Sequence, residues 1–121
     1  MTLDQSINAF DQLQPNAFTR AEKLRWLAEL DGQVWQELLR WRGQASPVPV
    51  YDEDTPGDTV LAIPEPYCGI YTVYLAMQAD RLNGEIARYN NDAALFHSQM
   101  QSFRAHWMRT NAPAPAVNLT L

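Results

Sequence analysis

Four segments of the 121-residue chain place apolar side chains three or four positions apart, the spacing that covers one face of an α-helix. A chain of this length is long enough for one hydrophobic core and too short for two independent ones. We therefore predict a single all-α domain over residues 1–121, built as a small bundle of about four helices. The predicted helices cover residues 4–13, 20–42, 66–89 and 92–110.

Residues that start or stop helices support these limits. Thr2 with Gln5, and Thr19 with Glu22, have the spacing of capping boxes, in which each side chain bonds the other's backbone. Pro66 suits the first turn of the third helix, which we expect to be the longest and the central one. The Asn-Asn-Asp sequence at residues 90–92 supplies capping side chains for the fourth helix.

Two segments break the helical period. Residues 43–64 contain several prolines and an Asp-Thr-Pro-Gly-Asp turn signal, which predicts a long central loop with few apolar anchors. A short run at residues 59–63 could add a strand there. Residues 112–121 alternate proline with small residues and favour an extended C-terminal tail that acts as an arm.

Composition excludes several classes of protein. The net charge of -5, with basic residues scattered along the chain, disfavours nucleic-acid binding, so we predict no sequence-specific contact with DNA or RNA. The sequence has neither an apolar run long enough to span a membrane nor the pattern of a signal peptide, which predicts a protein made in a cytoplasm without membrane contact. The single cysteine, Cys68, excludes an internal disulfide.

We find no pattern typical of a catalytic, cofactor or metal site. His97 and His106 stand nine positions apart, which places them on opposite sides of a helix. Asp52 and Asp54 faintly resemble the start of a calcium loop, but the later ligand positions hold unsuitable residues. We therefore predict that the protein is not an enzyme and binds no cofactor.

Two residues on the second predicted helix are unusual. Asp31 falls within the apolar arc, and a buried carboxylate needs partners. We predict a structural pairing with an arginine of the third helix, either Arg81 or Arg88, in a polar set that includes Glu85. An enzyme that uses Asp31, Glu85 and Arg88 is disfavoured because nothing near them resembles an activated group. Trp26 lies on the opposite, polar face, and tryptophan is enriched at interfaces.

Several segments resemble head–tail connector, or head-completion, proteins of tailed bacteriophages and prophages. The resemblance covers most of residues 20–110 and is carried by stretches that contain no catalytic signature. These stretches are Glu22–Gly32, Tyr51–Thr55, Leu61–Tyr67 and Asn83–Phe96. It implies an all-α virion structural protein at the head–tail junction that assembles as an oligomeric ring and contacts portal and tail-adaptor proteins.

Self-association in such a ring requires exposed surfaces, and the residues themselves indicate three: the second helix, the long loop and the tail. The candidate interface residues are Trp26, Tyr51, Asp52, Asp54, Val117, Leu119 and Leu121. Isolated copies of the protein could still be monomeric. The alternative function is a monomeric, prophage-encoded binding or regulatory module that holds a peptide in a helical groove.

Overall fold

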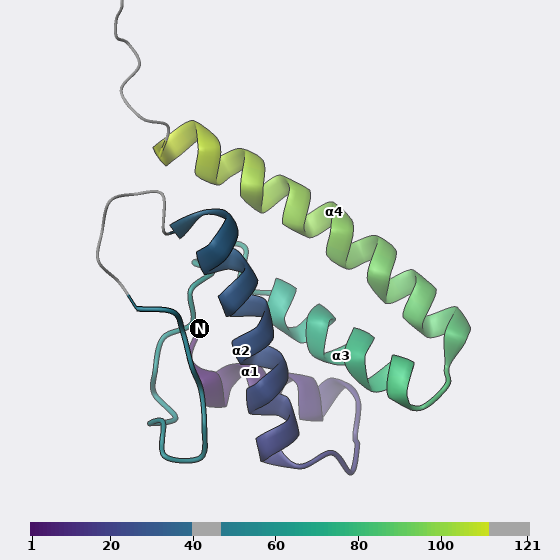
Figure 1. Cartoon of the computed structure of the whole chain (residues 1–121). Helices are drawn as coiled ribbons and strands as arrows, with labels where there is room; N and C mark the ends of the chain where they lie inside the picture. The colour runs from purple at the N-terminus through teal and green to yellow at the C-terminus, as the bar shows by residue number, and fades with distance from the viewer. Residues whose placement is uncertain (40–46, 112–121) are drawn as a thin grey trace, which may run out of the picture.

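A computed structural model describes residues 1–39 and 47–111, and it confirms an all-α bundle. The four helices are α1 (Leu3–Leu13), α2 (Arg20–Glu37), α3 (Ile70–Leu82) and α4 (Ile86–Asn111) (Figure 1). Within the described residues the only β feature is an isolated antiparallel bridge between Thr2 and Val60.

Both predicted capping boxes are confirmed. The Thr2 hydroxyl accepts the Gln5 N–H at 3.2 Å, and the Gln5 side chain accepts the Thr2 N–H at 2.9 Å. Thr19 and Glu22 make the same reciprocal pair at the start of α2. These bonds satisfy N–H groups that have no partner inside a helix, so local sequence determines where α1 and α2 begin.

The core forms around α3, which packs against each of the other three helices and is central, as predicted. Its buried side chains lie on most of its circumference. The largest fully buried side chains of the core come from all four helices and from the segment before α3. They are Trp26, Tyr71, Phe10, Phe103, Leu3, Leu24, Leu27, Leu30, Ile63, Ile70, Leu75 and Val34.

The boundary between the last two helices differs from the prediction. The helix expected at residues 66–89 begins at Ile70 and ends at Leu82, so Pro66 precedes the helix and does not open it. The next helix, α4, begins at Ile86, before the predicted residue 92, and with 26 residues it is the longest. Gly84 adopts a φ of 71°, a left-handed conformation that glycine accepts without strain, and it reverses the chain there. The polar run at residues 90–92 therefore lies inside α4 and does not cap it. The helix α2 ends at Glu37, before the predicted limit of residue 42.

The connecting segment, residues 47–69, is held to the rest of the fold more firmly than the prediction of a loop with few apolar contacts implied. It runs antiparallel to the N-terminus of the chain, and the N–H groups of Leu3 and Leu61 bond to Thr59 and Met1 carbonyls at 3.0 and 2.9 Å (Figure 1). Leu61 and Ile63 are buried in the core. The segment is thus part of the folded body. The predicted C-terminal arm, residues 112–121, lies outside the described residues.

Candidate functional site

A buried polar cluster centres on Asp31 of α2, whose side chain is fully buried. The hydroxyl of Tyr51 donates to Asp31 Oδ2 at 2.5 Å, and the hydroxyl of Tyr71 donates to Oδ1 at 2.5 Å. The backbone N–H of Ala62 also donates to Oδ2, at 3.0 Å. Tyr71 Oη in turn accepts the Ile63 N–H at 2.6 Å. One carboxylate therefore joins α2, α3 and the connecting segment.

Burial raises the pKa of Asp31 above its ordinary value, and the hydrogen bonds from Tyr51, Tyr71 and Ala62 offset part of this effect. Burial and the adjacent Asp31 carboxylate raise the pKa of both tyrosines well above the usual 10. The tyrosines thus stay protonated and act as donors. A tyrosine acting as a nucleophile or general base would need a lowered pKa, so the shifts give both tyrosines the properties of structural donors to Asp31.

The predicted pairing of Asp31 with an arginine is wrong. The guanidinium of Arg81 donates to Gln78 Oε1 at 3.2 and 2.9 Å. Arg88 lies on α4, beyond the end of α3, and Glu85 is exposed in the turn between them. Tyrosine hydroxyls satisfy a buried carboxylate without the desolvation of a second charge, which a buried guanidinium would require.

A second buried carboxylate, which the sequence analysis missed, lies on α3. Asp80 is 2% exposed, and its Oδ1 accepts Gln14 Nε2 at 3.0 Å. The guanidinium of Arg88 approaches the same oxygen at 3.9 Å. The carboxyl group of Asp92, on α4, faces Asp80 within hydrogen-bonding reach. The wide apolar arc of the third predicted helix was the available signal, because a carboxylate that falls within such an arc is covered by neighbouring elements.

The Asp92 carboxyl is unusual because its Oδ2 is buried and no donor reaches it. Two ionised carboxylates are both acceptors, so a hydrogen bond between Asp80 and Asp92 exists only when one of them carries a proton. Burial, followed by the bond and the charge of Asp80, raises the pKa of Asp92 to about 7, while Arg88 lowers it.

Trp26 is not a surface residue, and its prediction as an interface residue is wrong. Its side chain is 2% exposed and packs edge to face on Phe18, with ring centroids 5.2 Å apart. Phe18 belongs to the short connection between α1 and α2, which covers the side of α2 that the helical pattern assigned to solvent. The helical period locates an apolar stripe but does not show what covers the remaining faces.

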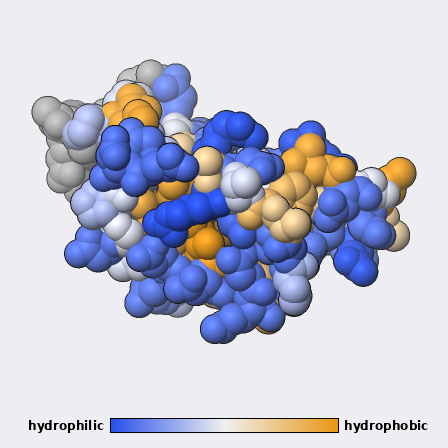
Figure 2. Space-filling model, turned by 90° about the horizontal axis from the view of Figure 1, so that it is seen from below, coloured by the Kyte–Doolittle hydropathy of each residue, from blue (hydrophilic) through white to orange (hydrophobic). Residues whose placement is uncertain are grey.

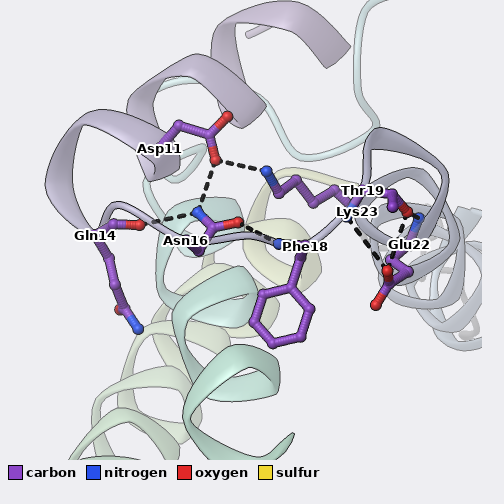
Figure 3. A network of polar contacts seen from close by, with 7 residues as sticks. All are labelled: Asp11, Gln14, Asn16, Phe18, Thr19, Glu22 and Lys23. Atoms are coloured by element: carbon purple, nitrogen blue, oxygen red, sulfur yellow. Dashed lines mark hydrogen bonds and ion pairs between the residues drawn. The ribbon is translucent and has the colours of Figure 1, made fainter. Parts of the chain in front are cut away.

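The corner between α1 and α2 is held by a polar network (Figure 3). Lys23 Nζ and Asn16 Nδ2 both donate to Asp11 Oδ1, at 2.8 and 2.9 Å, and Asn16 Oδ1 accepts the Phe18 N–H at 3.1 Å. Lys23 is only 5% exposed. Burial raises the pKa of Asp11, but the bonds from Lys23 and Asn16 outweigh it and leave that pKa below its ordinary value. The network fixes the connection that carries Phe18.

The other candidate interface residues fall into three groups. Tyr51 is half-buried and bonded to Asp31, so it anchors the connecting segment. Asp52 and Asp54 are exposed, and Asp52 Oδ1 accepts the Asp54 N–H at 2.9 Å, which stabilises a local turn. The three apolar residues of the tail lie outside the described residues; they are Val117, Leu119 and Leu121.

The remaining features offer little reactive chemistry. Burial, and then the neighbouring Glu65 side chain, raise the pKa of Cys68, which keeps its thiol protonated. A shallow hollow of about 210 Å³ lies between the end of the connecting segment and α4, lined by uncharged residues that include Tyr67, Ser98 and Ser102. Among residues 1–39 and 47–111, no group of three acidic, histidine or cysteine side chains could hold a metal ion.

A search for similar proteins finds no matching protein family, no matching curated protein and no matching solved structure. Within the described part of the chain, none of the helices combines the length and apolar character needed to cross a membrane.

Proposed function

We propose that this chain is a non-enzymatic connector subunit that assembles as a ring between the portal and the tail of a tailed bacteriophage. The resemblance to head–tail connector proteins over most of residues 20–110 supports this function. The all-α architecture is the one that the resemblance implies. The junction at Asp31 supports a structural role, because one carboxylate links three parts of the chain through bonds from two tyrosine hydroxyls and a backbone N–H.

The observation that carries the proposal is the exposure of α4. This helix has 26 residues and is about 39 Å long at 1.5 Å per residue, yet only Met100 and Phe103 are buried. It lies along the edge of the bundle with one side facing away from the other helices (Figure 1). Leu95 and Met108 remain 48% and 57% exposed, and at 100° per residue they lie on opposite flanks of the helix. A long helix that leaves apolar side chains exposed on both flanks is suited to contact with neighbouring subunits.

In the proposed interface, the exposed flanks of α4 replace the surface near Trp26 that the sequence predicted. A second exposed apolar region lies on the connecting segment, where Val50 and Val60 are each 71% exposed. Figure 2 shows apolar patches separated by hydrophilic surface, an arrangement typical of polar-rimmed contact sites. Because Tyr51 is bonded to Asp31, the connecting segment meets a neighbour in a fixed conformation and loses little entropy on binding.

The proposed mechanism is geometric. The helices form a rigid wedge, and repeated head-to-tail contacts between identical wedges close into a ring when the rotation between neighbours allows it. The chain's net charge of -5 suits a channel through which DNA passes without being retained.

The proposal is tested by adding purified protein to phage heads that lack it, followed by electron microscopy and an infectivity assay. We expect the wild type to bind at the portal, form rings and restore infectivity. The double variant Leu95→Gln with Met108→Gln should lose at least tenfold in head binding, as should a chain truncated after Asn111. Gln101→Ala, an exposed polar change on the same helix, is the matched control and should behave as the wild type.

The possible outcomes distinguish an error in the proposed function from an error in the proposed interface. If the wild type does not bind such heads, the connector function is wrong, and a monomeric binding or regulatory module becomes the better hypothesis. If the wild type completes heads and the variants on α4 do so equally well, α4 is not the interface.

A further inference from the structure

The first half of α4 is weakly anchored by apolar contacts. None of the described residues from Arg81 to Leu95 is buried, and only Tyr89, Asp92 and Ala93 are half-buried. The second half is different, because Met100 and Phe103 are buried in the core. Little apolar packing therefore holds the α3–α4 turn and the first turns of α4 in place. The local stability of this region consequently depends strongly on its polar contacts.

The principal polar contact in this region is the pair of carboxyl groups on facing helices. Asp80 is almost completely buried on α3, and on α4 the Oδ2 atom of Asp92 is buried without a hydrogen-bond partner. The Asp92 carboxyl interacts with that of Asp80, and a hydrogen bond between them requires a proton. From α1 the neutral Gln14 bonds to Asp80 Oδ1 at 3.0 Å. From α4 the cation Arg88 reaches the same oxygen only at 3.9 Å, and its side chain is 66% exposed.

The other charge nearby on α3 belongs to Arg81, which is bonded to Gln78. On α1 and α2, Asp11 and Lys23 are paired with each other at 2.8 Å. The surroundings therefore neutralise the carboxyl pair only in part. Arg88 alone would balance a second negative charge between the helices.

We propose that Asp80 and Asp92 share one proton and act as a pH-sensitive clamp that holds the first half of α4 against α3. In the protonated state an O–H group of one carboxyl donates to the other, and the two helices are joined. When the proton leaves to water, two like charges face each other at the helix interface. The first turns of α4 then separate from α3, and Gly84, with its φ of 71°, is the point about which they move. This inference is independent of the proposed function.

The direction of the pH effect follows from the pKa of Asp92, which is raised to about 7 from an ordinary value of 3.8. The folded state therefore retains a proton that the unfolded state releases. The resulting stabilisation is complete below about pH 3.8 and is lost as the pH rises through about 7. The clamp is closed in mildly acidic solution and open in mildly alkaline solution.

Hydrogen exchange of the full chain tests the clamp, with rates corrected for the intrinsic effect of pH. Between about pH 5.5 and about pH 8.5, on either side of the pKa of about 7, we expect the protection of residues 86–95 to fall about tenfold. Residues 100–107, which contain the buried anchors of α4, serve as the internal reference and should not change. Asp92→Asn should keep residues 86–95 protected at both pH values, because an amide donates to Asp80 and does not ionise.

Asp58→Asn, a change of an exposed carboxylate outside the pair, is the matched control and should show the wild-type pH dependence. A carbon NMR titration of the wild type provides a measurement that does not depend on any variant folding, and we expect one carboxyl of the pair to titrate near pH 7. The proposal is overturned if both carboxyls titrate below about pH 5, the range of ordinary carboxyls. Equal protection of residues 86–95 at both pH values in the wild type would also overturn it.

Discussion

Replacing Tyr71 with phenylalanine tests the junction at Asp31 most directly. The hydroxyl is buried and has two partners, since it donates to Asp31 Oδ1 at 2.5 Å and accepts the Ile63 N–H at 2.6 Å. The variant removes one donor from a buried carboxylate and leaves a buried N–H without a partner. A hydrogen bond to a charged group contributes about 1.5 to 3 kcal/mol, and an orphaned buried donor costs about 1 to 3 kcal/mol. Because both contacts belong to one hydroxyl and are not fully additive, we expect a total loss of about 3 to 4 kcal/mol.

Tyr51→Phe provides the graded comparison. Tyr51 donates to the same carboxylate, but its side chain is half-buried and its hydroxyl accepts no backbone N–H in the described structure. Water can replace part of the lost bond, so we expect a smaller loss of about 1 to 2 kcal/mol. Tyr89→Phe is the control, because its hydroxyl has no hydrogen bond to any described residue, and it should change stability by less than about 0.5 kcal/mol.

Urea unfolding followed by circular dichroism measures these differences. With an m-value of about 2 kcal/mol per molar, which is typical of small domains, Tyr71→Phe should lower the unfolding midpoint by about 1.5 to 2 M at unchanged m. A loss below about 1 kcal/mol for Tyr71→Phe, or a loss no larger than that of Tyr51→Phe, would contradict the role of the hydroxyl as a bridge between the carboxylate and the connecting segment.

Further predictions concern other parts of the fold. Asp31→Ala should cost about 3 to 5 kcal/mol in urea unfolding because it orphans three donors, and a tolerated change would exclude the junction. Trp26→Ala should cost about 3 to 5 kcal/mol by leaving a cavity, whereas a surface tryptophan would show no such loss. Gly84→Ala should lower the melting temperature by an amount equivalent to about 1 kcal/mol because its φ is 71°, and an unchanged melting temperature would show that the turn adapts. The lowered pKa of Asp11 means that its contribution is present above pH 3.8 and is lost as the pH falls further, so Asp11→Asn should flatten the acid side of the stability curve relative to the wild type.

Much of the helical architecture could be predicted from the sequence. Helix starts are local events, and the side chains of Thr2 and Thr19 bond to backbone groups three residues away, so their spacing alone was sufficient. The apolar period likewise identified the segments that form the core. The position of α3 at the centre of the bundle followed from the width of its apolar arc, which needs neighbours on several sides.

The boundary between α3 and α4 was harder to predict from the sequence. The apolar period continues through residues 83–86, and the sequence favoured one long helix there. The break depends on the left-handed conformation of Gly84 and on the packing of both helices on each other. A glycine inside a helical pattern is compatible with either outcome, because the cost of glycine within a helix, about 1 kcal/mol, is smaller than the energy of tertiary packing.

The sequence by itself therefore determined the fold class, the starts of the first two helices and the presence of a carboxylate at a buried position. Only the tertiary structure decided which partners that carboxylate has and which surfaces remain exposed. The partners of Asp31 are Tyr51 and Tyr71, and they come from 20 and 40 positions away along the chain. The burial of Trp26 likewise depends on Phe18, which reaches it from the connection before α2. A period along one helix specifies the direction of each side chain, but the neighbour in that direction is set by the packing of the whole chain.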